Sequence, residues 1–279
     1  MTRELTLGFS PCPNDTFIFH ALIQGLVPTP GLRFNVRLDD VETLNRLALD
    51  TRLDLTKVSY HALGHLRRDY VLLRSGGALG RGCGPLVVAR QPVTMAELRG
   101  QPLAIPGALT TANLLLQLYG SGYDNLRILP FDQIMAAVAN STVAAGVIIH
   151  ESRFTYQRHG LVQIADLGAW WETETGLPIP LGGILARRSL GTETIAVLES
   201  ALRQSVDYAF AHPAAARAYI KAHAQELDDT VIDQHIALYV NDFSRDLGEL
   251  GERAVVTLLA RAEARGLIPP SDLPLFAGS

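Results

Sequence analysis

Apolar residues in the first 90 positions recur with two periods, one typical of strands and one typical of helices. Residues 4–9 alternate between apolar and polar side chains, as a strand with one buried face does. The run 16–26 is apolar enough for a buried helix, and Asp39 and Asp40 stand where they can cap another. The same periods predict strands at 32–38, 53–58, 70–74 and 85–89, with helices at 41–48 and 59–67.

The pattern restarts after a glycine-dense stretch at 75–84, which predicts a flexible connection. Beyond it we expect strands at 101–105, 126–129 and 145–149, with helices at 110–119 and 131–139. Past Gly183 the spacing becomes helical throughout, and Pro213 suits a first helical turn. The helices expected in this last block cover 192–211, 213–225, 230–240 and 249–265.

Repeated alternation of strand and helix, followed by a helical block, is typical of the α/β class. With 279 residues and 48% hydrophobic content, the chain is long enough for two cores. We therefore expect two lobes, in which lobe two (91–183) is inserted into lobe one (1–90 and 184–279). In such folds the ligand lies in the cleft between the lobes, at the carboxyl ends of strands.

Charge and cysteine content narrow the classes of function. The formal net charge is −4 and the 24 Lys and Arg residues are scattered, so we expect no nucleic-acid partner. The two cysteines, Cys12 and Cys83, are too few for a disulfide framework and suit a reducing compartment. No stretch approaches the roughly 20 apolar residues that span a bilayer, and the first residues lack the apolar run of a secretory signal. These features predict a cytoplasmic protein without a membrane partner, and they leave the oligomeric state open.

The strand expected at 145–149 runs directly into the motif His-Glu-Ser-Arg at 150–153. An imidazole titrates near neutrality, and at the end of a buried strand it is partly desolvated yet within reach of a ligand. His150 is therefore the strongest candidate for a general base. A histidine that only caps or packs is the alternative.

The turn from strand to helix at 105–112 is a candidate anion site. Backbone N–H groups at a helix N-terminus are unpaired and lie at the positive end of the helix dipole. Thr110, Thr111 and Ala112 would present such groups to a ligand carboxylate. In the alternative, Thr110 or Thr111 is an ordinary N-cap.

Lys57, Val58 and Ser59 close another expected strand with a cation and a hydroxyl. These residues are candidates for binding a ligand carboxylate. In the alternative, the lysine is solvated and the serine caps the following helix.

Two further segments are candidates for the wall of a pocket. Two prolines in the loop 10–15 fix the backbone where the first strand meets the first helix, which points to Asn14 and Asp15. Either residue also suits a helix N-cap. Trp170 has the shape to stack on an aromatic ligand, although adjacent indoles are as often packing residues.

The spacing of potential ligands favours no metal site. His61 and His65 lie four apart without a third ligand at zinc spacing, and His150-Glu151 lacks the second histidine of a zincin motif. The glycines at 80, 82 and 84 lack the ending of a phosphate loop. We therefore expect neither a metal ion nor a nucleotide cofactor.

Three longer motifs resemble one known family. They are Gly-Phe-Ser-Pro-Cys-Pro-Asn-Asp-Thr-Phe at 8–17, Leu-Thr-Lys-Val-Ser-Tyr at 55–60 and Ile-Ile-His-Glu-Ser-Arg-Phe-Thr-Tyr at 148–156. Together they resemble the 1,4-dihydroxy-6-naphthoate synthase family of menaquinone biosynthesis. The likeness continues through 74–82, 166–171 and 222–227, and so covers nearly the whole chain.

This resemblance implies a fold like that of type II periplasmic binding proteins and a lyase that needs no metal or organic cofactor. The implied reaction converts cyclic dehypoxanthinyl futalosine to 1,4-dihydroxy-6-naphthoate with release of dihydroxyacetone, by base-triggered retro-aldol cleavage and aromatisation. The family's base falls on His150. Its substrate contacts fall on Lys57-Val58-Ser59 and Thr111-Ala112, to which Thr110 is added as a neighbour in the same turn.

Two other functions compete with this interpretation. A chorismate dehydratase of the same pathway resembles the family in fold and also eliminates from a carboxylated ring, but the motif at 150–156 argues against it. A plain solute-binding protein would capture a small carboxylate without reaction. Formation of product by the purified protein distinguishes the second from an enzyme.

Overall fold

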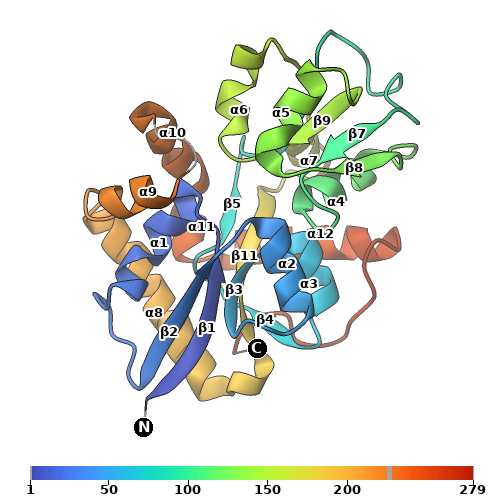
Figure 1. Cartoon of the computed structure of the whole chain (residues 1–279). Helices are drawn as coiled ribbons and strands as arrows, with labels where there is room; N and C mark the ends of the chain where they lie inside the picture. The colour runs from blue at the N-terminus through green and yellow to red at the C-terminus, as the bar shows by residue number, and fades with distance from the viewer. Residues whose placement is uncertain (1, 225–227, 279) are drawn as a thin grey trace.

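The first of two β-sheets appears in the computed structural model, which describes residues 2–224 and 228–278 (Figure 1). Its described strands are β1 (Arg3–Phe9), β2 (Leu32–Leu38), β3 (Leu55–Ser59), β4 (Tyr70–Leu72), β5 (Ala78–Gly80) and β11 (Ile179–Arg187). Their order is β2-β1-β3-β11-β4, and β5 also pairs with β11. β1 runs parallel to β2 and β3, whereas β11 runs antiparallel to β3, β4 and β5. This sheet forms lobe one.

The second sheet is built from a contiguous part of the chain. Its described strands are β6 (Leu86–Ala89), β7 (Leu103–Ile105), β8 (Leu126–Ile128), β9 (Ala145–Ile148) and β10 (Val162–Asp166). Their order is β10-β6-β9-β7-β8. β7 runs parallel to β8 and β9, while β6 runs antiparallel to β9 and β10. This sheet forms lobe two, so the two-lobed α/β class predicted from the sequence is confirmed.

The chain passes from one sheet to the other at residues that differ from the expected lobe limits. The apolar pattern puts 86–89 in lobe one, but β6 pairs with β9 and β10 in the second sheet. The expected limit at 184 falls inside β11, all of which pairs within the first sheet. Both strands are buried along nearly their whole length, so neither shows an alternation that would indicate its sheet.

The helices of the first 140 residues lie where the apolar pattern predicts them. They are α1 (Pro13–Ile23), α2 (Val41–Leu49), α3 (Tyr60–Leu66), α4 (Thr111–Tyr119) and α5 (Phe131–Ala139). Asp40 caps α2 as expected, because its carboxylate accepts hydrogen bonds from the backbone of Glu42 and Thr43. α1 begins at Pro13 rather than at the expected Thr16, since a proline in the first turn sacrifices no helical hydrogen bond.

The region after β9 contains elements that the apolar pattern does not mark. They are α6 (Ser152–Thr155), the short 3-10 helix η1 (Tyr156–His159) and α7 (Leu167–Thr175). The glycine-dense connection at 75–84 is also less irregular than expected, because it contains β5, which pairs with β11. The strand β5 is therefore stabilised by pairing with a partner distant in the sequence.

The C-terminal block is helical, as predicted. It contains α8 (Thr192–Ala211), α9 (Arg217–His223), α10 (Asp229–Tyr239), α11 (Asp242–Arg245) and α12 (Gly248–Ala264). The prediction that Pro213 stands in the first turn of a helix is wrong, since α9 starts at Arg217. The expected end of that helix at Gln225, and the motif that extends to 227, reach beyond the described residues.

One apolar cluster joins the two lobes. Val58 and Leu63, beside the first sheet, belong to the same buried cluster as Val87 and Leu103 of the second sheet. α12 packs against both α3 and α4, and so against an element of each lobe (Figure 1). The lobes are therefore held together along this side of the molecule.

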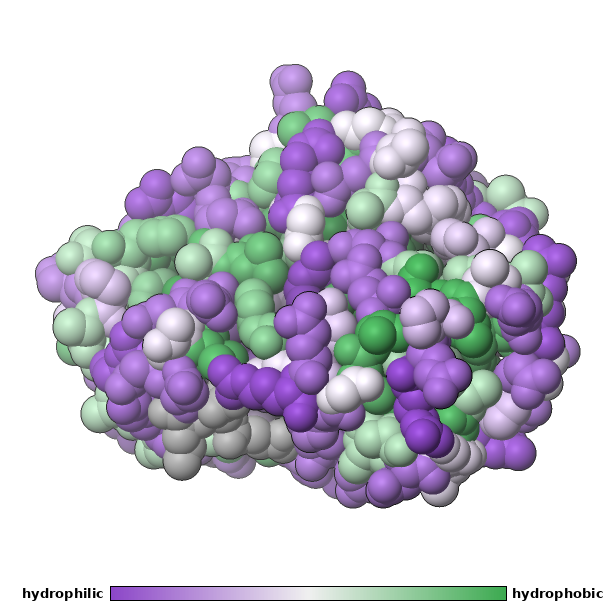
Figure 2. Space-filling view, turned by 90° about the horizontal axis from the view of Figure 1, so that it is seen from above, coloured by the Kyte–Doolittle hydropathy of each residue, from purple (hydrophilic) through white to green (hydrophobic). Residues whose placement is uncertain are grey.

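The large apolar side chains that are exposed on the described part of the chain are scattered along the sequence. Figure 2, which views the molecule from above the orientation of Figure 1, shows hydrophilic side chains dividing the apolar ones into small areas. The large apolar side chains with the greatest exposure are Leu26, Leu49, Val93, Ile128, Leu250, Val256 and Leu273. None of the described helices is long and apolar enough to cross a membrane.

Gly84 and Gly168 bring the backbone before β6 against the start of α7. A Cβ on Gly84 would lie 2.3 Å from Gly168 Cα and 2.4 Å from its N. We expect Gly84→Ala to cost about 3 kcal/mol or more of unfolding free energy, since backbone atoms cannot rotate away as side chains do. Urea denaturation measures this cost.

Gly77 supplies the matched control, because a Cβ there would meet its nearest atom only at 3.5 Å. Gly77→Ala is therefore expected to unfold close to the parent midpoint. Equal midpoints for the two variants would show that the contact between Gly84 and Gly168 does not limit stability.

Candidate active site

A cavity lies between the two lobes. Side chains from β3 and α1 of lobe one line it together with residues that follow β9 and begin α4 in lobe two. The sequence-predicted site residues that line it are Asn14, Asp15, Lys57, Ser59, Thr110, Thr111, Ala112 and His150. The structure therefore brings together four segments that are far apart in the sequence.

Two of the predicted site residues lie elsewhere. Val58 is fully buried in the apolar cluster, because successive side chains of β3 point to opposite faces and only Lys57 and Ser59 face the cavity. Trp170 does not line the cavity, and its ring packs edge-on against Tyr119 with 5.3 Å between centroids. The expectation that Trp170 forms the pocket wall is therefore wrong, and its packing alternative holds.

His150 stands just past the end of β9 with a left-handed backbone, at a φ of 56°. The residue is half-buried and lines the cavity, and its ring lies 5.2 Å from the Phe131 ring, centroid to centroid. Burial lowers the pKa of His150 from its ordinary 6.5 to about 4, and Lys57 lowers it further while Asp15 acts in the opposite direction. The imidazole is therefore neutral at pH 7 and able to accept a proton.

Lys57 forms a buried ion pair with Asp15, with 2.6 Å between Nζ and Oδ1 and side-chain exposures of 6% and 2%. The solvated lysine considered from the sequence is thus wrong. Asp15 also accepts hydrogen bonds from the Ser10 hydroxyl and the Asn14 amide, each at 2.8 Å. An ammonium group has three donors, so Lys57 retains the capacity to bind a ligand in the cavity.

Neither Asn14 nor Asp15 is the N-cap of α1, a position that Cys12 occupies. Both lie in the first turn of the helix, where they are buried. Ser59 stands at the N-cap of α3, but its side chain makes no capping hydrogen bond and instead accepts one from Asn45 at 3.2 Å. The side chains of Asn14, Asp15 and Ser59 therefore do not cap these helices, contrary to the alternatives considered from the sequence.

Thr110 is an N-cap, since its hydroxyl accepts a hydrogen bond from the backbone N of Asn113 at 3.3 Å. Thr111 uses its hydroxyl between the lobes: it accepts from the backbone N of Tyr60 at 2.9 Å and donates to the Leu181 carbonyl at 2.5 Å. The structure records no partner among the described residues for the backbone N–H of Thr111 or Ala112. These two groups at the start of α4 remain for an anion.

The C-terminal helices contribute a residue that sequence reasoning missed. His235 on α10 is fully buried, and its ring lies parallel to that of His150 with 6.0 Å between centroids. Its Nε2 is 2.9 Å from Asn14 Oδ1, and its Nδ1 is 3.7 Å from Glu151 Oε2. The sequence did offer one indication of this residue. His235 lies on the buried face of α10 with Val231 and Ile232, and an ionisable side chain in such a position needs a polar partner.

The architecture is that of a periplasmic-binding-protein-like protein. An Archaeoglobus fulgidus protein of known structure has a TM-score of 0.89 and 36% identity, with 95% of this chain and 98% of that chain covered. A Candida albicans protein described as having the generic periplasmic binding protein fold has a TM-score of 0.68 and 16% identity, with coverages of 97% and 92%. The predicted fold is thereby confirmed.

A family model described as menaquinone biosynthesis matches residues 5–264. A Thermus thermophilus protein named 1,4-dihydroxy-6-naphthoate synthase is 60% identical over 274 residues, which cover 98% of this chain and 99% of that protein. A Streptomyces coelicolor protein of the same name is 49% identical over 271 residues, with 95% of each chain covered. The chain belongs to the menaquinone biosynthesis family, and the resemblance seen in its motifs is confirmed.

Proposed function

We propose that this chain is a 1,4-dihydroxy-6-naphthoate synthase that converts cyclic dehypoxanthinyl futalosine to 1,4-dihydroxy-6-naphthoate and dihydroxyacetone. The observation that carries the proposal is a neutral imidazole, His150, at a cavity that also presents a cation and a helix N-terminus. Full-length relatives that carry the synthase name support the same assignment.

The proposed reaction begins when His150 removes a proton from a hydroxyl of the sugar-derived ring. The alkoxide then collapses to a carbonyl, and the neighbouring C–C bond breaks in the retro-aldol sense. Elimination then expels the three-carbon fragment, which takes up a proton and leaves as dihydroxyacetone, and the remaining ring becomes the aromatic naphthoate. Aromatisation supplies the driving force. A neutral imidazole suits this first step, because it can accept the proton directly, whereas a protonated imidazole would first have to release its own.

The substrate carboxylate is proposed to bind at the start of α4. The backbone N–H groups of Thr111 and Ala112 lie at the positive end of that helix, and Lys57 adds a charged donor from the opposite lobe. Contacts from both lobes would hold the scissile bond against His150. We also propose that the protein is cytoplasmic, that its bound partner is a small carboxylate, and that it needs no cofactor.

The decisive experiment incubates the purified protein with cyclic dehypoxanthinyl futalosine without added metal or cofactor, followed by mass-resolved chromatography. Appearance of dihydroxynaphthoate and dihydroxyacetone in equal amounts is the expected result. Bound but intact substrate would favour a carboxylate-binding protein instead. Turnover of chorismate in place of this substrate would favour the dehydratase.

The pH profile of kcat/KM should show its acid limb near pH 4, not near the 6.5 of an unperturbed imidazole. Above about pH 4 the His150 ring is neutral and active, and below it the added proton removes the lone pair on which the reaction depends. Initial rates across the acid range measure this limb, with tryptophan fluorescence at each pH to separate unfolding from titration. An inflection at 6.5 in folded protein would contradict a desolvated base.

A further inference from the structure

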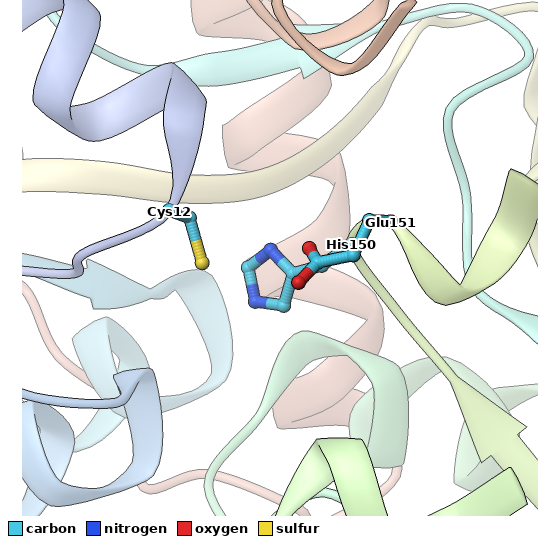
Figure 3. Close-up of side chains that lie close together, drawn as sticks. All are labelled: Cys12, His150 and Glu151. Atoms are coloured by element: carbon cyan, nitrogen blue, oxygen red, sulfur yellow. The ribbon is translucent and has the colours of Figure 1, made fainter. Parts of the chain in front are cut away.

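Cys12 lies close to the consecutive residues His150 and Glu151 beside the cavity, although it is far from them in the sequence (Figure 3). One ligand atom from each, a sulfur, a ring nitrogen and a carboxylate oxygen, lies within 4.8 Å of the others. Figure 3 shows Cys12 Sγ facing the His150 ring from the start of α1, while His150 and Glu151 come from the chain beyond β9. The cluster therefore spans both lobes.

His235 supplies a fourth donor atom beside this cluster. The Asn14 amide nitrogen donates to Asp15, so Asn14 Oδ1 faces His235 as an acceptor and Nε2 of the ring must carry the hydrogen. In the neutral ring, Nδ1 then has a free lone pair. This atom is fully buried, has no hydrogen-bond partner among the described residues, and lies 3.7 Å from Glu151 Oε2.

A thiolate, two imidazoles and a carboxylate form a donor set that suits zinc or cobalt in tetrahedral coordination. The sulfur and nitrogen donors disfavour magnesium and calcium, which prefer oxygen ligands. Zinc bonds of about 2.0–2.3 Å place neighbouring ligand atoms roughly 3–4 Å apart. Cys12 and Glu151 would therefore rotate toward the ion, and because the His150 and His235 rings are parallel, one of the two rings would turn as well. The spacing of these residues in the sequence gives no sign of a site, because three separate segments contribute.

We propose that Cys12, His150, Glu151 and His235 form an inhibitory site for a zinc-class divalent cation. The bound cation would occupy the lone pair of His150 and link α1 and α10 of lobe one to the end of β9 in lobe two. It would thus block proton transfer and hold the cleft closed. The binding site stands on its own geometry, whereas the inhibition rests on the proposed function.

Cobalt titration of the purified full chain tests binding directly, without any substrate. We expect one Co²⁺ per chain, with the near-ultraviolet absorption of a cobalt–thiolate bond and the visible bands of tetrahedral cobalt, both removed by added Zn²⁺. Cys12→Ser should abolish the thiolate band and weaken Zn²⁺ binding by at least about tenfold, since even outer-sphere changes cost 10–100-fold. Cys83→Ser, at the other buried cysteine, is the control and should keep the band.

A second variant guards against an indirect effect at Cys12. His235→Gln places an amide where Nε2 lies and preserves the contact with Asn14, but it has no atom in place of Nδ1. We expect weaker cobalt binding with circular dichroism unchanged. Absence of bound Co²⁺ in the parent protein, or a thiolate band that persists in Cys12→Ser, would overturn the site.

Inhibition is tested separately. Micromolar Zn²⁺ should stop turnover of the parent protein and a chelator should restore it, while Cys12→Ser, measured against its own rate without zinc, should resist inhibition. Zinc binding without inhibition would overturn the inhibitory part. If the chain shows no synthase activity at all, the cobalt spectra still decide whether the cation site exists, so the two proposals fail separately.

Discussion

Replacing His150 by asparagine is expected to lower kcat by about 10²- to 10⁴-fold while the protein stays folded. The substitution removes the only proton acceptor that the proposed reaction uses. Asparagine is the sharper choice over alanine, because the backbone at this position has a φ of 56° and asparagine adopts the left-handed region readily. Product formation under saturating substrate measures the effect.

The matched control is His159→Asn, at an exposed histidine of the same lobe. It should retain the parent rate. Urea midpoints of both variants establish that neither is unfolded. Parent-like turnover by the His150 variant would remove this residue from the role of base and leave the cavity without its proposed chemistry.

The second large effect is on stability. Lys57→Met should lower the free energy of unfolding by about 3–5 kcal/mol, because it leaves the Asp15 carboxylate buried without its cation. Ser10 and Asn14 would still donate to Asp15, but neither carries a charge. Urea denaturation at neutral pH measures the loss.

Two further variants test that cause. The double variant Lys57→Met with Asp15→Asn should be more stable than Lys57→Met alone, since no unpaired charge remains. Lys221→Met breaks an exposed ion pair with Asp229 and should change the unfolding free energy by less than about 1 kcal/mol. Additive losses in the double variant would mean that the two buried groups are not coupled.

The sequence predicts the elements of the fold where local periodicity determines them. β2 follows from its alternation and α2 from its 3.6-residue stripe, and both patterns are present in the structure. β10 and β11 do not follow, because β10 contains a register shift between Gln163 and Ala165, and β11 contains Pro180 and two glycines that disfavour strands in isolation. Pairing with partner strands stabilises them, and that information is not local.

The candidate site shows the same limit. Position at the end of a strand was enough to place His150 at the cleft, whereas Lys57 lines the cavity from inside β3. The partner of Lys57 was not predictable, since Asp15 lies 42 positions away in the sequence. His235 lies 221 positions from Asn14 and belongs to a helix whose docking on α1 has no local signature.

The place of β11 between β3 and β4 has a consequence for the order in which the nascent chain folds. Every strand of the second sheet has been synthesised by Asp166, so that sheet can form while the ribosome is still producing the rest. The first sheet must wait for residues 179–187, and until then β3 and β4 present open edges to other chains. Expression at lower temperature, or with chaperones that shield such edges, should therefore raise the yield of soluble protein more than changes to the second lobe would.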